Sequence, residues 1–340
     1  MKNILRILAL AAVLACSFCF QSCKGRRGAL LPNISGKAGE IIVVIEKNDW
    51  EGTLGSSVRE LLAGDCPYLA SKEPLYTLVN VTPGGFADLF KVHRNIILFD
   101  IDAQVAKSGI SYMQDKWAAP QCLINIAAHD REEAISLFRD GGPMILSTIE
   151  QAERDRVIRN SLRYEQKDIA PQVAEVFGGS PHIPIGYQLK KKTSDFVWIA
   201  DEKQKSIQGI LIYKYPAGKD AGAEFKMENI IARRNAVMRT NVPGMFDNTW
   251  MTTSTQVTPS LEYIRYRGRQ FAQLRGYWEV QNDFMGGPFV SHSFYSPDGA
   301  SIIVAEAFVY APSHDKRQFL RQAESILYSW EWNNDAKGEN

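Results

Sequence analysis

Short apolar runs rich in β-branched residues alternate with helical patterns through the first part of the chain, and this alternation sets the class of fold. The runs are EIIVVIE (40–46), LYTLVNV (75–81), NIILFDI (95–101) and CLINIAA (122–128). Val58, Leu61 and Leu62 stand at helical spacing between the first two runs. Strands that alternate with helices in this way favour an α/β sheet with at least some parallel pairing.

The last third of the chain has a different pattern, because its runs are longer and alternate between apolar and polar residues. They are QFAQLRGYWEV (270–280), GPFVSHSFY (287–295) and SIIVAEAFVY (301–310). SPDG between the last two is a hairpin signal, and Phe319, Ala323, Ile326 and Trp330 predict a final helix. This half is expected to be an antiparallel sheet packed with helices, so the whole chain combines α/β and α+β architecture.

A charged helical stretch separates the two patterns. Between Ile149 and Val157 the only apolar side chain is Ala152, and so weak a stripe predicts a partly solvated helix that bridges two bodies. The Pro- and Gly-rich FGGSPHIPIG ends this stretch. The predicted divisions are a leader (1–22), a flexible arm (23–39), an N-terminal α/β domain (40–129), a helical connector (130–177), a C-terminal antiparallel α+β domain (178–333) and a disordered tail (334–340).

The charge balance argues against one class of partner. The 340 residues include 39 Lys and Arg and 38 Asp and Glu, which gives a formal charge of +1. Such a chain has no basic field to attract nucleic acid. We therefore expect no nucleic-acid partner.

The N-terminal segment has the pattern of a secretory signal. Lys2 precedes an apolar stretch that runs from Ile7 to Phe20. About 14 residues is too short to cross a bilayer comfortably, since a spanning helix needs about 20, but it suits the apolar region of a signal peptide.

Three cysteines, Cys16, Cys19 and Cys23, stand at the end of this segment. The region resembles the lipobox of bacterial lipoproteins, in which a small residue precedes a cysteine that receives diacylglycerol. Cys23 follows Ser22 and precedes polar KGRRG, so it is the preferred lipid attachment point, with Cys16 as the alternative. Metal or redox use would need a folded pocket with further ligands, which an apolar leader does not supply.

Lipidation at Cys23 would make a membrane the first partner of the chain. The basic residues of KGRR can rest on anionic headgroups, with about 1 kcal/mol for each charge. Surface-exported lipoproteins of Bacteroides-type bacteria tend to carry acidic residues directly after the cysteine, and this chain does not. We therefore expect a cell-envelope protein that faces the periplasm, at the inner membrane or the inner leaflet of the outer membrane.

Two stretches of the second half carry a family resemblance: MGGPFV (285–290) and YAPSHDKRQFLRQAE (310–324). Together with the cysteine-terminated leader, they make nearly the whole mature chain resemble domain-of-unknown-function family 4837, predicted lipoproteins of Bacteroides-type bacteria. The resemblance implies location and architecture, and it brings no catalytic residues.

The run GGPFVSHSFY offers a candidate binding surface. Gly286 and Gly287 permit unusual backbone angles or a close approach by a partner, and alternation puts Phe289 and His292 on opposite faces of a strand. With Trp278, one face is a candidate aromatic platform for peptide or glycan. The favoured alternative is a tight turn that leads into a core strand.

No complete catalytic or metal-binding motif is present, and we expect neither a metal nor another cofactor. A hydrolytic site dispersed over His93, Asp100 and Asp102 is the one enzymatic alternative. Cys66 and Cys122, the only cysteines after Cys23, are either a disulfide or two free thiols. The leading hypothesis is thus an anchored, non-catalytic binding or assembly component of the cell envelope, whose partner is an envelope protein or a glycan.

The anchor is directly testable. A Cys23→Ala variant is expected to stay unlipidated and to leave the membrane fraction, as measured by metabolic labelling with a lipid precursor and by cell fractionation. Continued lipid labelling of this variant would assign the attachment point to Cys16 instead.

Overall fold

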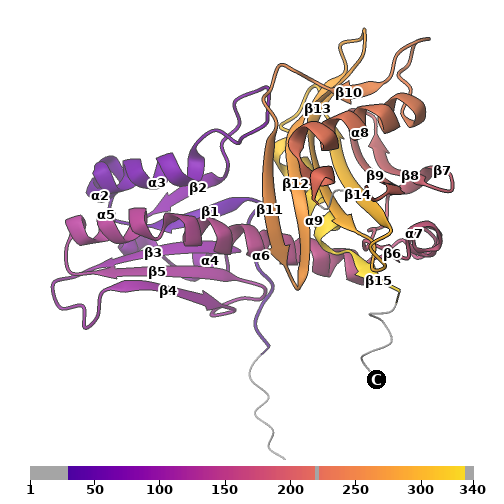
Figure 1. Ribbon diagram of the computed structural model, residues 1–340. Coiled ribbons are helices and arrows are strands. Elements are labelled where there is room, and N and C mark those ends of the chain that lie inside the picture. The colour runs from indigo at the N-terminus through magenta and orange to yellow at the C-terminus, as the bar shows by residue number, and fades with distance from the viewer. Residues whose placement is uncertain (1–29, 219–221, 334–340) are drawn as a thin grey trace, which may run out of the picture.

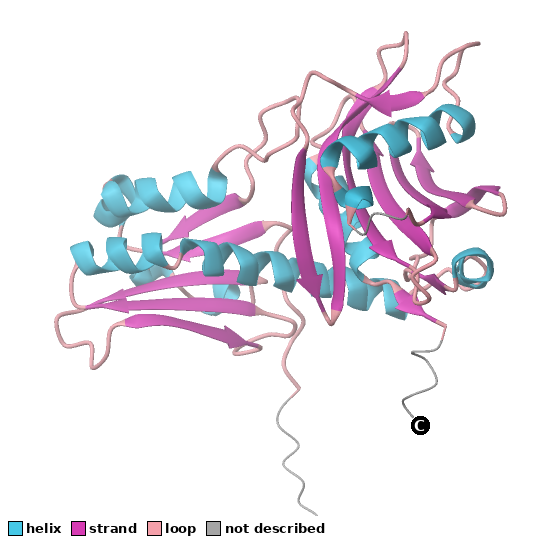
Figure 2. Ribbon diagram, viewed as in Figure 1, coloured by secondary structure: helices cyan, strands magenta, loops and turns pink. Residues whose placement is uncertain are grey.

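The computed structural model of the protein describes residues 30–218 and 222–333. Two units lie side by side and share one long helix (Figure 1). The N-terminal unit holds a mixed sheet, and the C-terminal unit holds a curled antiparallel sheet, each packed with helices (Figure 2). The predicted fold class is therefore confirmed. The leader with Cys23 and the tail 334–340 lie outside the described residues.

The N-terminal sheet has the strand order β2-β1-β3-β5-β4, in which only β4 is antiparallel to its neighbour. Its strands are β1 (Glu40–Val44), β2 (Thr77–Val81), β3 (Asn95–Ile101), β4 (Gly109–Gln114) and β5 (Cys122–Ala128). The helices are α2 (Lys47–Glu51), α3 (Thr53–Ala63), η2 (Pro83–Gly85), α4 (Asp88–Lys91) and α5 (Arg131–Asp140). Side chains of α3 and α5 cover one face of the sheet, where Ile41 and Val43 are buried, while Ile42 and Val44 pack on the other face.

The C-terminal sheet has the order β10-β12-β13-β14-β9-β8-β7, and β11 also pairs with β12. Its strands are β7 (Gln188–Lys192), β8 (Phe196–Lys203), β9 (Ser206–Pro216), β10 (Met251–Thr253), β11 (Ser260–Tyr266), β12 (Arg269–Val280), β13 (Gly286–Tyr295) and β14 (Ser301–Tyr310). The remaining elements are α7 (Ala170–Phe177), β6 (Gly179–Ser180), η3 (Ala223–Phe225), α8 (Met227–Asn241), α9 (Arg317–Tyr328) and β15 (Glu331–Trp332).

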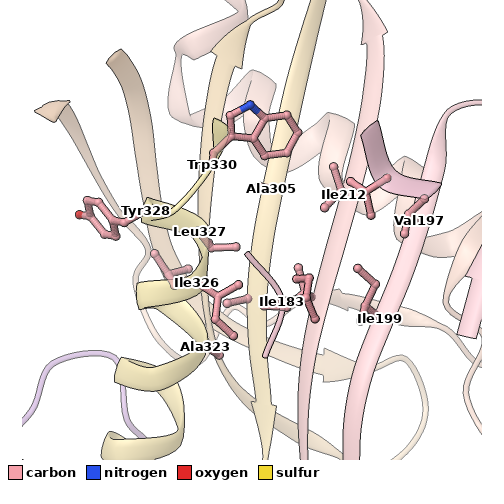
Figure 3. Packing of buried hydrophobic residues seen from close by; sticks show 14 of the residues in the cluster. Ile183, Val197, Ile199, Ile212, Ala305, Ala323, Ile326, Leu327, Tyr328 and Trp330 are labelled. Atoms are coloured by element: carbon pink, nitrogen blue, oxygen red, sulfur yellow. The ribbon is translucent and has the colours of Figure 1, made fainter. Parts of the chain in front are cut away.

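Both faces of this sheet are covered. One core contains residues of α7 and α9, and Figure 3 shows Ile326 and Leu327 of α9 beside the strand residues Ile199 and Ile212. The opposite core contains residues of α8, including Ile230. The sheet therefore has no face left open to solvent along its central strands.

The helix α6 (Gly142–Arg163) joins the two units. Ile149 belongs to the N-terminal core and Ile158 to one C-terminal core. The predicted helical connector, 130–177, contains α5, α6 and α7, and these helices contribute to both cores. Residues around the middle of α6 are partly exposed, as the weak apolar stripe predicted, but Glu153 is buried there.

The segment 32–39, called the strap below, lies on the N-terminal unit. Its first bond joins the carbonyl of Pro32 to the amide of Ala119, and Ser35 makes a parallel bridge with His93. Gly36 has a φ of 88°, and a Cβ there would lie 2.1 Å from His93 Nε2. The arm expected to be flexible over 23–39 is thus bonded to the domain from Pro32 onward, because glycine permits this close approach.

Candidate functional site

The aromatic surface predicted from Trp278, Phe289 and His292 is not at the surface. Their side chains are 2%, 0% and 1% exposed. Phe289 and His292 do lie on opposite faces of β13, but α8 packs over Phe289 and the α9 residue Tyr328 over His292. The prediction of a binding surface is corrected to a core strand, because helices cover both faces of the sheet.

The glycine pair before this strand serves internal packing. A Cβ on Gly287 would lie 1.9 Å from the carbonyl oxygen of Val309, and one on Gly286 would lie 2.9 Å from that of Trp278. The indole Nε1 of Trp278 donates a hydrogen bond of 3.2 Å to the Val309 carbonyl. These glycines therefore admit a neighbouring strand and an indole of the same chain.

His292 is a buried polar group within one core. Its Nε2 lies 3.2 Å from Gln273 Oε1, which also accepts a hydrogen bond of 2.9 Å from the hydroxyl of Tyr328. Its ring stacks on Phe271. Burial, with a smaller effect from nearby Arg269, holds the pKa of His292 well below its ordinary value. The imidazole is therefore neutral at pH 7.

The three residues predicted to form a hydrolytic site, His93, Asp100 and Asp102, do not lie close together. Asp100 and Asp102 are exposed at the carboxyl end of β3, whereas His93 is buried before its first residue. A strand of this length separates them by roughly 20 Å. His93 Nε2 instead lies 2.8 Å from Glu40. These three side chains cannot act on one reacting atom.

The two cysteines of the described chain are free thiols. Burial raises the pKa of both Cys66 and Cys122 to about 11, so both are protonated at neutral pH. No cluster of three His, Cys, Asp or Glu side chains suited to a metal ion occurs among residues 30–218 and 222–333.

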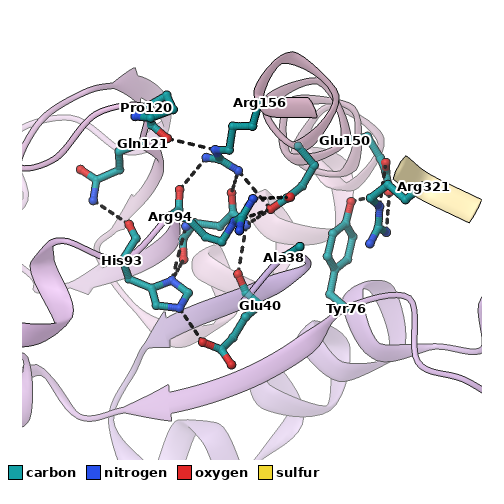
Figure 4. Close-up of polar contacts among 12 residues, drawn as sticks. Ala38, Glu40, Tyr76, His93, Arg94, Pro120, Gln121, Glu150, Arg156 and Arg321 are labelled. Atoms are coloured by element: carbon teal, nitrogen blue, oxygen red, sulfur yellow. Dashed lines mark hydrogen bonds and ion pairs between the residues drawn. The ribbon is translucent and has the colours of Figure 1, made fainter. Parts of the chain in front are cut away.

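The middle of α6 carries a buried charge that sequence patterns did not reveal. Glu153 accepts hydrogen bonds from Arg94 Nε and Nη2 at 3.0 and 2.8 Å, from Arg156 Nη1 at 3.0 Å and from Asn95 Nδ2 at 2.7 Å. Arg156 also donates to the carbonyl of Pro120, and Figure 4 shows these contacts converging. The network holds α6 on the amino end of β3.

One turn earlier on α6, Glu150 forms an ion pair with the C-terminal unit. It accepts a hydrogen bond of 3.0 Å from Arg321 of α9 and another from the hydroxyl of Tyr76 (Figure 4). Burial alone would raise the pKa of Glu150, but the charge and hydrogen bonds of Arg321 outweigh it and hold this pKa below its ordinary value. The carboxylate is therefore ionised and paired at neutral pH.

A further carboxylate caps α9 from across the domain boundary. Glu73 accepts hydrogen bonds of 3.0 and 2.9 Å from the backbone amides of Lys316 and Arg317. These amides have no partner within the helix, and a negative charge at this end also suits the helix dipole. Gln318 then donates to the carbonyl of Ala38 in the strap at 2.7 Å.

Beside this network lies a hollow of about 360 Å³, called the interdomain hollow below. Its walls come from α6, the segment 184–187, the β8–β9 hairpin, α9 and the strap, and they include Arg94, Ser161, Tyr187, Asp201, Gln208 and Arg321. Ser161 and Gln208 are only 1% and 6% exposed. Within the part of the chain that the structure describes, Ser161 Oγ and Gln208 Oε1 have no hydrogen-bond partner.

Two family models match the chain in succession. The model described as Domain of unknown function (DUF4837) matches residues 166–329, and the one described as Domain of unknown function (DUF8532) matches residues 34–162. The resemblance to the first family is thus found over the C-terminal half, not over nearly the whole mature chain. The boundary between the two matches falls at the end of α6.

The similarities of this chain to other known proteins are weak. No curated protein matches. A crystal structure from Bacteroides thetaiotaomicron VPI-5482 is similar at 9% identity with a TM-score of 0.25, over 47% of this chain and 46% of that one. The human StarD13 (DLC2) lipid transfer and protein localization domain is similar at 11% identity with a TM-score of 0.17, over 48% of this chain and 95% of that domain. The chain thus spans about half the length of the first of these structures. At such TM-scores neither likeness informs fold or function.

No helix within the described ranges is both long and apolar enough to cross a membrane.

The Glu153 network predicts a large loss of stability when its charge is removed. Glu153→Gln leaves Arg94 and Arg156 without a carboxylate partner, and breaking a buried pair costs about 3–5 kcal/mol in the free energy of unfolding. Glu51→Gln breaks the exposed pair with Lys47 at 3.8 Å and is the control, with an expected effect within about 0.5 kcal/mol. Urea unfolding at pH 7 measures both, and equal effects would contradict the assigned role.

Buried His292 predicts an acid-dependent loss of stability. Its pKa is ordinary, about 6.5, in the unfolded chain and lower in the folded one, so below pH 6.5 the unfolded chain binds the extra proton. The free energy of unfolding should then fall by about 1.4 kcal/mol for each pH unit below 6.5. In His292→Phe this component should be absent. Urea unfolding between pH 7.5 and 5 compares the slopes, and identical slopes would refute the assignment.

Proposed function

We propose that this protein is a lipid-anchored component of the cell envelope that faces the periplasm and acts by binding a ligand, without catalysis. The observation that carries this proposal is the interdomain hollow of about 360 Å³, which is lined by polar side chains from both units, among them Arg94, Gln208 and Arg321. Polar side chains that converge on one cavity can bind and orient a small molecule.

The position and stiffness of the hollow support a binding role. Ligand sites occur preferentially at domain interfaces, and the walls of this one are held by the pairs of Glu153 with Arg94 and of Glu150 with Arg321. Because the walls are already ordered, binding would cost little conformational entropy.

The N-terminal sequence supports the location. The leader ending at Cys23 has the features of a lipoprotein signal, and the strap begins nine residues later, at Pro32. A chain of that length spans at most about 30 Å. Lipidation at Cys23 would thus hold the interdomain hollow close to the membrane surface.

Thermal unfolding tests the binding role. The full-length protein in detergent is mixed separately with the glycan, lipid and peptide fractions of the envelope of the producing bacterium. One fraction should raise the midpoint of the wild type, because a ligand that binds only the folded state stabilises it. The same fraction should not shift Gln208→Leu, which loses the amide in the hollow.

The control variant is Gln104→Leu, which loses an exposed amide that does not line the hollow. It should respond to each fraction as the wild type does. The proposal is wrong if every fraction shifts the wild type and Gln208→Leu equally, or if none shifts either.

A further inference from the structure

We propose that the interdomain hollow binds a small molecule through a carboxylate group of that molecule. This inference rests on the proposed binding function and names the chemical class of the ligand. Two features of the lining lead to it: an excess of positive charge and hydrogen-bond donors without an acceptor. The volume of about 360 Å³ lies near the lower end of the range of about 300–1,000 Å³ for small-molecule sites, so the ligand is compact.

The lining of the hollow carries more positive than negative charge. Its charged members are four cations and two carboxylates: Arg94, Arg156, Lys203, Arg321, Glu153 and Asp201. Two of the cations each have a carboxylate of their own. Lys203 lies 2.9 Å from Asp201, and Arg321 lies 3.0 Å from Glu150 of α6. These two pairs are neutral, so the excess charge belongs to the other two cations.

The other two cations share one carboxylate. Arg94 and Arg156 both bond to Glu153, at 2.8 and 3.0 Å, so this group of three keeps one net positive charge. The carboxylate of Glu40 lies 2.8 Å from His93 Nε2 instead, and it is not part of the lining (Figure 4). Burial lowers the pKa of Arg156, and the charge of Arg94 adds to this effect while Glu153 opposes it. A second negative charge here would therefore stabilise both guanidinium groups.

Two side chains of the hollow keep donors that nothing in the described chain accepts. Arg94 donates through Nε and Nη2 to Glu153, whereas its Nη1 has no acceptor within residues 30–218 and 222–333 and is not fully buried. The same holds for the hydroxyl of Tyr187, although this residue is only 5% exposed. Both side chains line the hollow. Because buried polar groups are nearly always hydrogen-bonded, these donors mark a place for acceptor atoms of a ligand.

The hydroxyl of Tyr187 stays a donor at neutral pH. Burial raises the pKa of Tyr187, and the charge of Asp201 adds a smaller effect in the same direction. The ring belongs to the C-terminal core, whereas Arg94 directly precedes β3 of the N-terminal sheet. A carboxylate accepts hydrogen bonds and donates none, which suits a lining that offers donors from both units. The ligand would thus connect the two units through its oxygens.

Other ligand charges match the hollow less well. A cationic group would add to the excess positive charge, and a neutral amide of the same shape would leave that charge uncompensated. A carboxylate supplies one negative charge, which equals the excess of the group around Glu153. A phosphate monoester carries about −1.5 to −2 at pH 7 and would exceed it. The charge balance therefore favours a carboxylate.

Calorimetric titration of the full-length protein tests the ligand class with matched probes, in a buffer free of phosphate and carboxylate. Glucuronate is compared with glucose, and N-acetylalanine with its amide. At least one acid should bind at up to millimolar concentration, and its neutral counterpart about tenfold more weakly, because hydrogen bonds to a charged group are the stronger ones. Tyr187→Phe should raise the Kd of that acid by roughly tenfold, because it loses one such bond. Tyr112→Phe changes an exposed tyrosine outside the hollow and should bind like the wild type.

The thermal midpoint of each variant without ligand is measured first. Tyr187→Phe removes a hydroxyl that bonds nothing in the described chain, so it should fold like the wild type. Arg94→Lys keeps a positive charge beside Glu153 but has no Nη1, and it should also weaken binding of the acid.

The inference is overturned if neither acid binds, if a neutral counterpart binds as tightly as its acid, or if both variants bind the acid like the wild type. Inorganic phosphate is titrated in the same way. If it binds more tightly than both acids, the carboxylate class is overturned and the binding function stands. The binding function itself fails only if no envelope fraction distinguishes Gln208→Leu from the wild type.

Discussion

Two carboxylates one turn apart on α6 fix how the two units are placed. Glu153 is bonded to Arg94 and Arg156 at the end of the N-terminal sheet, and Glu150 is bonded to Arg321 of α9. An ion left buried without its partner is strongly destabilising, so neither sheet can move away from α6 without a large cost. The walls of the interdomain hollow come from these same elements. Its shape therefore depends on these ion pairs together with residues of the C-terminal core, such as Tyr187 and Ile326, that also line it.

The strands of the N-terminal sheet could be read from the sequence because most of them are buried on both faces. A strand such as β3 then appears as a continuous apolar run, NIILFDI. The edge strand β4, GISYMQ, was not predicted, since its residues are half-buried or exposed and give no such run. The same holds for β11, SLEYIRY. Sequence patterns thus report apolar composition more than position in the sheet, since the other edge strand, β2, is only half-buried and was still predicted from its apolar run.

The candidate site, in contrast, could not be predicted from local sequence patterns. Ser161, Gln208 and Arg321 come from three distant elements, and no local pattern connects them. The run around Phe289 drew attention because its alternation is clear, yet whether a helix covers a strand face is decided by other parts of the chain. One signal for the buried network was present in the sequence. The apolar stripe of α6 is interrupted between Ile149 and Val157, and Glu153 is buried in this interval. A charged residue at a position where the helix should face a core marks a network that the fold must complete elsewhere.

The strap determines the order in which contacts bear load when the chain is pulled from its N-terminal side. Any tension on the chain before Pro32 reaches the hydrogen bonds of the strap first, at Ala119 and beside His93. The next bond in line is the one from Gln318 of α9 to the carbonyl of Ala38. The load thus arrives at the contact between the units before it enters either sheet. The strap would therefore yield first to a pull from the N-terminal side, and the junction that shapes the hollow would bear the load next.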